Sequence, residues 1–147
     1  MRRRTEEQKL TCIKRAIFNA QEHVRANDPT RVYSQYVRYA LDEVLDLNFY
    51  TSIEAKGLKR KEVVHEHVFP HSILLKKLLS LNPLTNENIM SVLQKYYVIC
   101  AITKDEDKRL NAAGLRSKMP DGWNDNDSVF ARYEHEEVGI SIFSGKE

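Results

Sequence analysis

Three histidines and a glutamate lie close together in a short apolar segment of this chain. His65, Glu66, His67 and His71 fall within or directly after residues 63–69, which are otherwise rich in valine. Imidazole and carboxylate groups are costly to bury without partners. They are also the groups that transfer protons near neutral pH and bind divalent metal ions. The segment is therefore the first candidate for a functional site.

The same segment has the pattern of a β-strand, because it is short, apolar and rich in β-branched residues. Side chains alternate between the two faces of a strand, so His65 and His67 should share one face while Glu66 points to the other. Pro70 cannot donate a hydrogen bond to a neighbouring strand and could introduce a bend. We expect Glu66 to act beside His67 only if the backbone is irregular there.

A cluster of positive charge precedes this strand and consists of Lys56, Lys59, Arg60 and Lys61. Such a run is commonly a solvated loop, but next to a histidine site it could hold the phosphates of a nucleic acid. The net charge of the whole chain is only +2. The local distribution of charge, and not the total, therefore suggests a polyanionic partner.

Helices and a second strand should position these residues. Apolar residues at three- and four-residue spacing predict helices over residues 5–25 and 31–47, which should pack as a hairpin. Two shorter helices are predicted over residues 72–81 and 86–94. The β-branched and aromatic run at residues 96–102 predicts a buried strand.

The second strand leads directly into another helix, since Thr103 and Glu106 have the spacing of a capping box. The order of strand, intervening segment, strand and helix resembles the HNH endonucleases, also called His-Me finger or ββα-metal nucleases. The resemblance rests on the sequence EHVFP at residues 66–70 and on the acidic helix start within residues 102–110. It covers about residues 63–110, under half of the chain.

The resemblance implies a role for each candidate residue. His67 would be the general base that activates water, and Glu66 and Asp107 would hold a divalent metal ion, Mg²⁺ or Mn²⁺. Arg109 would contact the scissile phosphate. The substrate would be a nucleic acid, which we expect to be DNA, and a homodimer that cuts both strands is left open.

Two asparagines, Asn86 and Asn88, are candidates for the residue that orients the catalytic histidine in this family, and their spacing does not separate them. The chain departs from the family pattern in other ways. It contains only Cys12 and Cys100, so the paired cysteines of the zinc-stabilised members are missing. Asp107 also stands where many members have histidine or asparagine.

Two other functions are compatible with the same residues. His65, His67 and His71 could bind Zn²⁺ in a structural site, with Asp107 as a fourth ligand. Alternatively, the chain could be a non-catalytic module with a nuclease-like fold that binds nucleic acid or a protein, because a fold does not guarantee an activity.

Composition limits the class of protein. A chain of 147 residues, with 41% hydrophobic and 30% charged residues, suits one ordinary domain. No apolar run approaches the roughly 18 residues that a membrane span needs. The N-terminus lacks the apolar core of a secretory signal. We therefore expect a cytoplasmic protein without a membrane partner.

Together these patterns predict a mainly helical α+β fold in one domain over residues 1–147. A helical hairpin at residues 1–50 should pack on a ββα-metal core, similar to that of HNH nucleases, at residues 56–115. Residues 116–147 should form a small C-terminal extension.

Overall fold

The computed structural model describes residues 4–44 and 46–143 and divides into two compact units. Met1–Leu45 and Leu75–Gln94 form the helical unit, while Asp46–Leu74 and Lys95–Glu147 form the sheet unit. Each unit joins two segments that are distant in the sequence. Most of the second pair of helices groups with the N-terminal hairpin, and the three consecutive parts that we expected stay a prediction.

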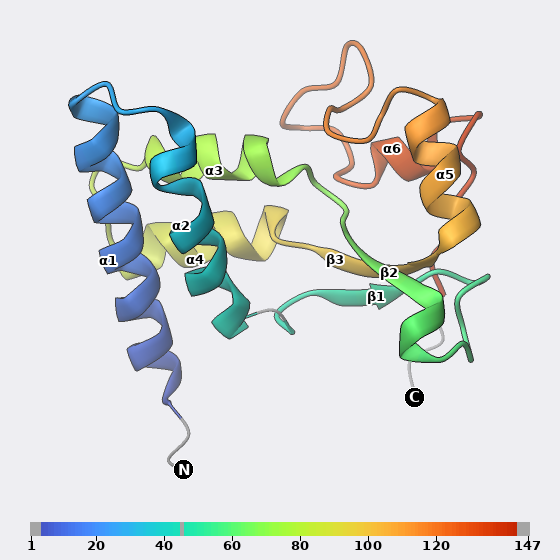
Figure 1. Ribbon diagram of the computed structural model, residues 1–147, viewed down its shortest axis with the longest axis horizontal. Coiled ribbons are helices and arrows are strands. Elements are labelled where there is room, and N and C mark those ends of the chain that lie inside the picture. Colours follow the sequence, from blue (N-terminus) through green and yellow to red (C-terminus); the bar gives the residue numbers. More distant parts are fainter. Residues whose placement is uncertain (1–3, 45, 144–147) are drawn as a thin grey trace. The chain divides into compact units, whose positions relative to one another are not determined.

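The helical unit contains the hairpin that the sequence predicts. Helix α1 (Glu6–Arg25) packs against α2 (Ser34–Leu41), as Figure 1 shows. Most of α3 (His71–Leu79) and of α4 (Asn86–Tyr96) belongs to the same unit. Two single turns of 3-10 helix, Thr30–Val32 and Asp42–Val44, also belong to this unit, whereas a third, Arg60–Glu62, belongs to the sheet unit.

The sheet unit is built on three short strands in the order β1-β3-β2. The central strand β3 (Ile99–Thr103) is parallel to β1 (Phe49–Thr51) and antiparallel to β2 (Val63–His67). Four of its five residues are buried, which is the reason for its almost continuous apolar sequence. The small strand β1 was not predicted, because three residues are too few to show a strand pattern.

Helix α5 (Lys104–Ala112) begins directly after β3 and contacts both β2 and β3 (Figure 1). The hydroxyl oxygen of Thr103 accepts a hydrogen bond from the backbone N–H of Glu106 at 3.0 Å, so the predicted capping box is confirmed. The short helix α6 (Ala131–Glu134) follows a long turn-rich segment. The core of this unit comprises Val68, Val98, Cys100, Ile102, Leu110, Leu115, Tyr133, Val138 and Ile140.

The mainly helical α+β fold and the order of strand, two helices, strand and helix are therefore confirmed. No helix among residues 4–44 and 46–143 is long and apolar enough to cross a bilayer. The resemblance of the β2, β3 and α5 arrangement to a ββα-metal core stays a prediction.

Candidate functional site

Strand β2 places Glu66 and His67 on opposite faces of the sheet. Its five residues pair one to one with β3, with Glu66 opposite Cys100. The pairing continues past the strand, because the backbone N–H of Val68 donates to the carbonyl of Val98 at 2.9 Å. The backbone therefore has no bulge at this point, and the two candidate side chains flank the strand. Strand β2 therefore lacks the backbone irregularity that would bring Glu66 and His67 to the same face.

The carboxylate of Glu66 is held by two side chains of α6. One terminal nitrogen of Arg132, Nη2, donates to Oε2 of Glu66 at 2.5 Å. The hydroxyl group of Tyr133 donates to Oε1 at 2.5 Å. Only 12% of the Glu66 side chain is exposed, and that of Arg132 is completely buried. The acidic candidate is thus the centre of a buried, hydrogen-bonded cluster.

The guanidinium group of Arg132 has no unused donor. Nη1 donates to the carbonyl oxygens of His67 at 2.8 Å and Val68 at 2.7 Å. Nε donates to the carbonyl of Leu115 at 2.8 Å, and Nη2 donates to that of Arg116 at 3.3 Å as well as to Glu66. An arginine side chain carries five N–H donors. All five are therefore used inside the sheet unit.

No local pattern in the sequence marks Arg132 and Tyr133 as part of a buried site, and both are buried in the structure. Helix α6 has only four residues, so it carries no readable periodicity. The one available signal was that a carboxylate in a buried strand needs a partner of opposite charge, which sequence spacing does not identify.

The surroundings of Glu66 change its acidity in opposing ways. Burial raises the pKa of Glu66 above its ordinary value, and the negative charge of Asp107 adds to the rise. The positive charge of Arg132, and the hydrogen bonds from Arg132 and Tyr133, lower the pKa in part. Asp107 lies on α5 and Glu66 lies on β2. These two elements contact each other, so the two predicted metal carboxylates come from neighbouring elements.

The three histidines do not form a cluster with one another. The ring of His67 lies with its centroid 5.4 Å from that of His71 and 6.0 Å from that of Tyr97. His65 is exposed and meets the ring of Phe49 edge to face at 5.3 Å. Within the part of the chain that the structure describes, no group of three or more histidine, cysteine or acidic side chains could hold a metal ion. The alternative zinc site therefore gains no support from the geometry.

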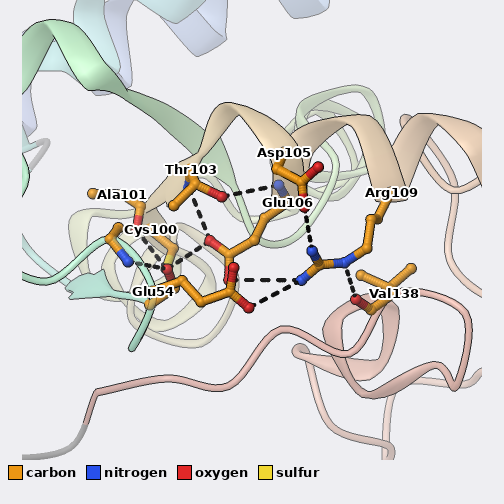
Figure 2. Close-up of polar contacts among 10 residues, drawn as sticks. Glu54, Cys100, Ala101, Thr103, Asp105, Glu106, Arg109 and Val138 are labelled. Carbon is orange, nitrogen blue, oxygen red and sulfur yellow. Dashed lines mark hydrogen bonds and ion pairs between the residues drawn. The ribbon is translucent and has the colours of Figure 1, made fainter.

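Arg109, the predicted phosphate contact, is bound to acidic groups and to the backbone (Figure 2). Its Nε donates to the carbonyl of Val138 at 2.7 Å, and Nη1 donates to Asp105 at 2.6 Å. Nη2 lies 3.4 Å from a carboxylate oxygen of Glu54. The side chain is 30% exposed. A contact with phosphate stays a prediction, and it would compete with the two carboxylates.

Glu106 is a second buried carboxylate in the same unit, and Figure 2 shows it at the start of α5. Its Oε1 accepts hydrogen bonds from the hydroxyl of Ser52 at 2.6 Å and from the backbone N–H of Thr103 at 2.8 Å. Its Oε2 accepts no hydrogen bond from the described residues, and the nearest cation is Nη2 of Arg109 at 4.0 Å. These contacts join the end of β1 to the start of α5, which is a structural role.

The two asparagines belong to the helical unit, whereas His67 belongs to the sheet unit. The side chain of Asn88 donates to the carbonyl of Pro83 at 2.8 Å, so it stabilises its own turn. Oδ1 of Asn86 is buried and accepts no hydrogen bond from the described part of the chain. The orienting role of either asparagine stays a prediction.

The basic cluster is exposed throughout. Lys59, Arg60 and Lys61 precede β2 directly, and the latter two lie in a single 3-10 turn. The ammonium group of Lys56 lies 4.1 Å from the centre of the Phe143 ring, a cation–π contact. The cluster is therefore accessible to a polyanion next to the strand that carries the candidate base, and its binding role stays a prediction.

Comparisons with known proteins add no relative: no family model, no curated protein and no solved structure matches this chain. The HNH resemblance is thus neither supported nor contradicted from outside the molecule. The sheet unit contains a mostly buried Glu66, whose pKa is raised in part by the negative charge of Asp107. The imidazole of His67 lies one residue further along β2, and an exposed basic cluster precedes the strand.

Proposed function

We propose that this protein is a divalent-metal-dependent endonuclease that hydrolyses phosphodiester bonds in DNA. One observation supports the proposal most strongly. Strand β2 lies beside β3, β3 leads directly into α5, and α5 contacts β2, so the helix that carries Asp107 packs against the strand that carries Glu66 and His67. Two acidic groups and a histidine within one ββα arrangement are the parts that metal-assisted hydrolysis requires.

The donor groups suit a hard divalent ion such as Mg²⁺ or Mn²⁺. Carboxylate oxygens are the preferred ligands, with water in the remaining positions. Oε1 of Glu66 accepts hydrogen bonds from Tyr133 and, at 3.5 Å, from Nη1 of Arg132, whereas Oε2 accepts one from Nη2 of Arg132 and has capacity for a second interaction. Glu66 and Asp107 would hold such an ion, which would supply positive charge where negative charge develops on the phosphate.

His67 would remove the proton from the attacking water, because imidazole titrates near neutral pH. Strand β2 is an edge strand of the sheet, so in the proposed site a phosphodiester would lie along its outer edge, between the face that carries Glu66 and the face that carries His67. Lys59, Arg60 and Lys61 would attract and hold the nucleic-acid backbone, since all three are exposed immediately before β2.

A non-catalytic nucleic-acid-binding module is the second candidate. The observation that favours it is that the hydrogen bonds of Arg132 and Tyr133 already account for the burial of Glu66. In this alternative, the exposed basic cluster still binds nucleic acid, but Glu66 has a structural role only.

Cleavage of supercoiled plasmid DNA by purified protein distinguishes the two candidates. The reaction is run with Mg²⁺, with Mn²⁺ and with EDTA. We expect nicking that requires the metal, and a rate about 10²–10⁴-fold lower in His67→Ala, because that variant lacks the general base. His135→Ala is the matched control, since His135 has no place in the site, and circular dichroism checks the fold of each variant.

Two results would reject the nuclease. One is equal cleavage by wild type and by folded His67→Ala. The other is the absence of cleavage under all metal conditions, combined with salt-sensitive binding of DNA, which is the behaviour of the binding module.

A further inference from the structure

We propose that Arg132 and Tyr133 are positioning residues, which together fix the Glu66 carboxylate and the end of β2 and thereby set the affinity of the site for a divalent metal ion. The inference rests on the proposed function, because it assigns Glu66 to a metal site. It adds two residues of α6 that neither the sequence nor the family resemblance placed in that site.

Arg132 fixes the backbone at the end of β2. Nη1 of Arg132 donates to the carbonyls of His67 and Val68, at 2.8 and 2.7 Å. Its other nitrogens donate to Leu115 and Arg116, on the segment that follows α5. One planar group therefore ties the residue that bears the candidate base to a second part of the sheet unit. Because all five donors are used, the guanidinium has a single favourable orientation.

Arg132 and Tyr133 also fix the orientation of the Glu66 carboxylate. The terminal torsion of a glutamate side chain is normally broad. Here Oε1 accepts from Tyr133 and Oε2 accepts from Arg132, so rotation of the Glu66 carboxylate would break two short hydrogen bonds. The ring of Tyr133 is itself 1% exposed and packs edge to face against Phe130 at 5.9 Å. The remaining acceptor capacity of Glu66 is thus held in a fixed direction.

Burial of the Arg132–Glu66 ion pair costs free energy. A buried ion pair adds little net stability compared with apolar residues of similar size, because both charges lose their hydration. Stability alone is therefore a weak reason for a completely buried arginine opposite Glu66. A fixed geometry is what such a pair provides and an apolar contact does not. Partners that orient a metal ligand typically change metal affinity about 10–100-fold when they are removed.

Two conservative variants test the inference. Tyr133→Phe removes one hydroxyl donor to Glu66 and keeps the ring, while Arg132→Lys keeps the charge and loses the planar set of donors. Binding of Mn²⁺ is measured by electron paramagnetic resonance in the absence of DNA, and the Mn²⁺ dependence of plasmid cleavage is measured beside it. We expect the Kd for Mn²⁺ to rise about 10–100-fold in both variants.

Ser52→Ala is the matched control. It removes a hydroxyl donor at 2.6 Å from the other buried carboxylate, Glu106, so it should lower thermal stability without changing the Kd for Mn²⁺. The control separates loss of position from general destabilisation. If Arg132→Lys does not fold, Tyr133→Phe decides alone, because the missing oxygen is its only change.

The outcomes separate this inference from the proposed function. An unchanged Kd for Mn²⁺ in folded Tyr133→Phe overturns the positioning role, even if the wild type cleaves DNA. Mn²⁺ binding that weakens in the variants, in a wild type that cleaves no DNA, supports the positioning role and rejects the nuclease. A wild type that binds no Mn²⁺ overturns both.

Discussion

Glu66 is a mostly buried and Glu106 a completely buried glutamate of the sheet unit, but different kinds of contact hold them. The donors to Glu106 are the backbone at Thr103, three residues away, and the hydroxyl of Ser52 in the β1 region. The side-chain donors to Glu66 are Arg132 and Tyr133, which lie 66 and 67 residues further along the chain. The first glutamate is part of a helix start, and the second is the centre of a tertiary cluster.

The difference supports the proposal that Glu66 has a functional role and Glu106 a structural one. A capping glutamate is explained completely by the helix that it begins. Glu66 begins no helix, and it is held from both sides by donors while Asp107 acts on it electrostatically. The associated arginines differ in the same way, because Arg109 is partly exposed and Arg132 is completely buried.

The largest effect on stability should come from Arg132, and the partly exposed Arg109 gives the contrast. Arg132→Met leaves Glu66 without its buried cation, so the free energy of unfolding should fall by about 3–5 kcal/mol. Arg109→Met removes partly exposed ion pairs with Asp105 and Glu54, so a loss of only about 0–1 kcal/mol is expected from those pairs. Urea unfolding at neutral pH measures both. Equal losses would mean that the two arginines do not differ as their burial indicates.

A smaller effect is expected at Glu106. Ser52→Ala removes a hydrogen bond to a charged, buried oxygen and should cost about 1.5–3 kcal/mol of unfolding free energy. The rate of DNA cleavage by the folded variant should match that of the wild type, because this contact joins β1 to α5 and lies outside the proposed site. A large loss of cleavage without a loss of stability would move the functional site toward Glu106.

A pH-dependent effect is expected at Cys100, which lies opposite Glu66 in the sheet. Burial raises the pKa of the Cys100 thiol from 9.0 to about 12, and the charges of Glu106 and Glu66 add to the rise. Because the folded protein disfavours the thiolate, the thiol contributes stability below pH 9.0 that is lost as the pH rises toward about 12. The stability difference between wild type and Cys100→Ala should therefore shrink over that range.

Alkylation gives a second measure of the same thiol. In a Cys12→Ser background, Cys100 should react with iodoacetamide only as fast as the protein unfolds, because it is completely buried. Rapid labelling of the folded protein at pH 9 would contradict this burial.

The sequence predicted the elements with local signals. The continuous apolar run of β3 and the capping box of Thr103 and Glu106 depend on neighbouring residues, so pattern alone was sufficient. The alternation that separates His65 and His67 from Glu66 follows from the strand itself and agrees with the regular pairing of β2.

The contacts around Glu66 could not be predicted in this way. Arg132 and Tyr133 lie in a four-residue helix after a turn-rich segment, and no periodicity marks them. Their distance along the chain from Glu66 gives no spacing that a motif could describe. Arg109 shows the opposite case, because the HNH resemblance implied a contact with the scissile phosphate, whereas the structure pairs Arg109 with Asp105, one helical turn before it, at 2.6 Å.

The most direct test compares Glu66→Gln with Glu106→Gln in the plasmid cleavage assay with Mn²⁺, with urea unfolding of both proteins. Folded Glu66→Gln should cleave DNA about 10–100-fold more slowly than the wild type, or not at all, because a metal ligand has lost its charge. Glu106→Gln should cleave at the wild-type rate while its free energy of unfolding falls by about 1–3 kcal/mol. Wild-type cleavage by Glu66→Gln, together with loss of cleavage in a stable Glu106→Gln, would contradict the proposed role of Glu66.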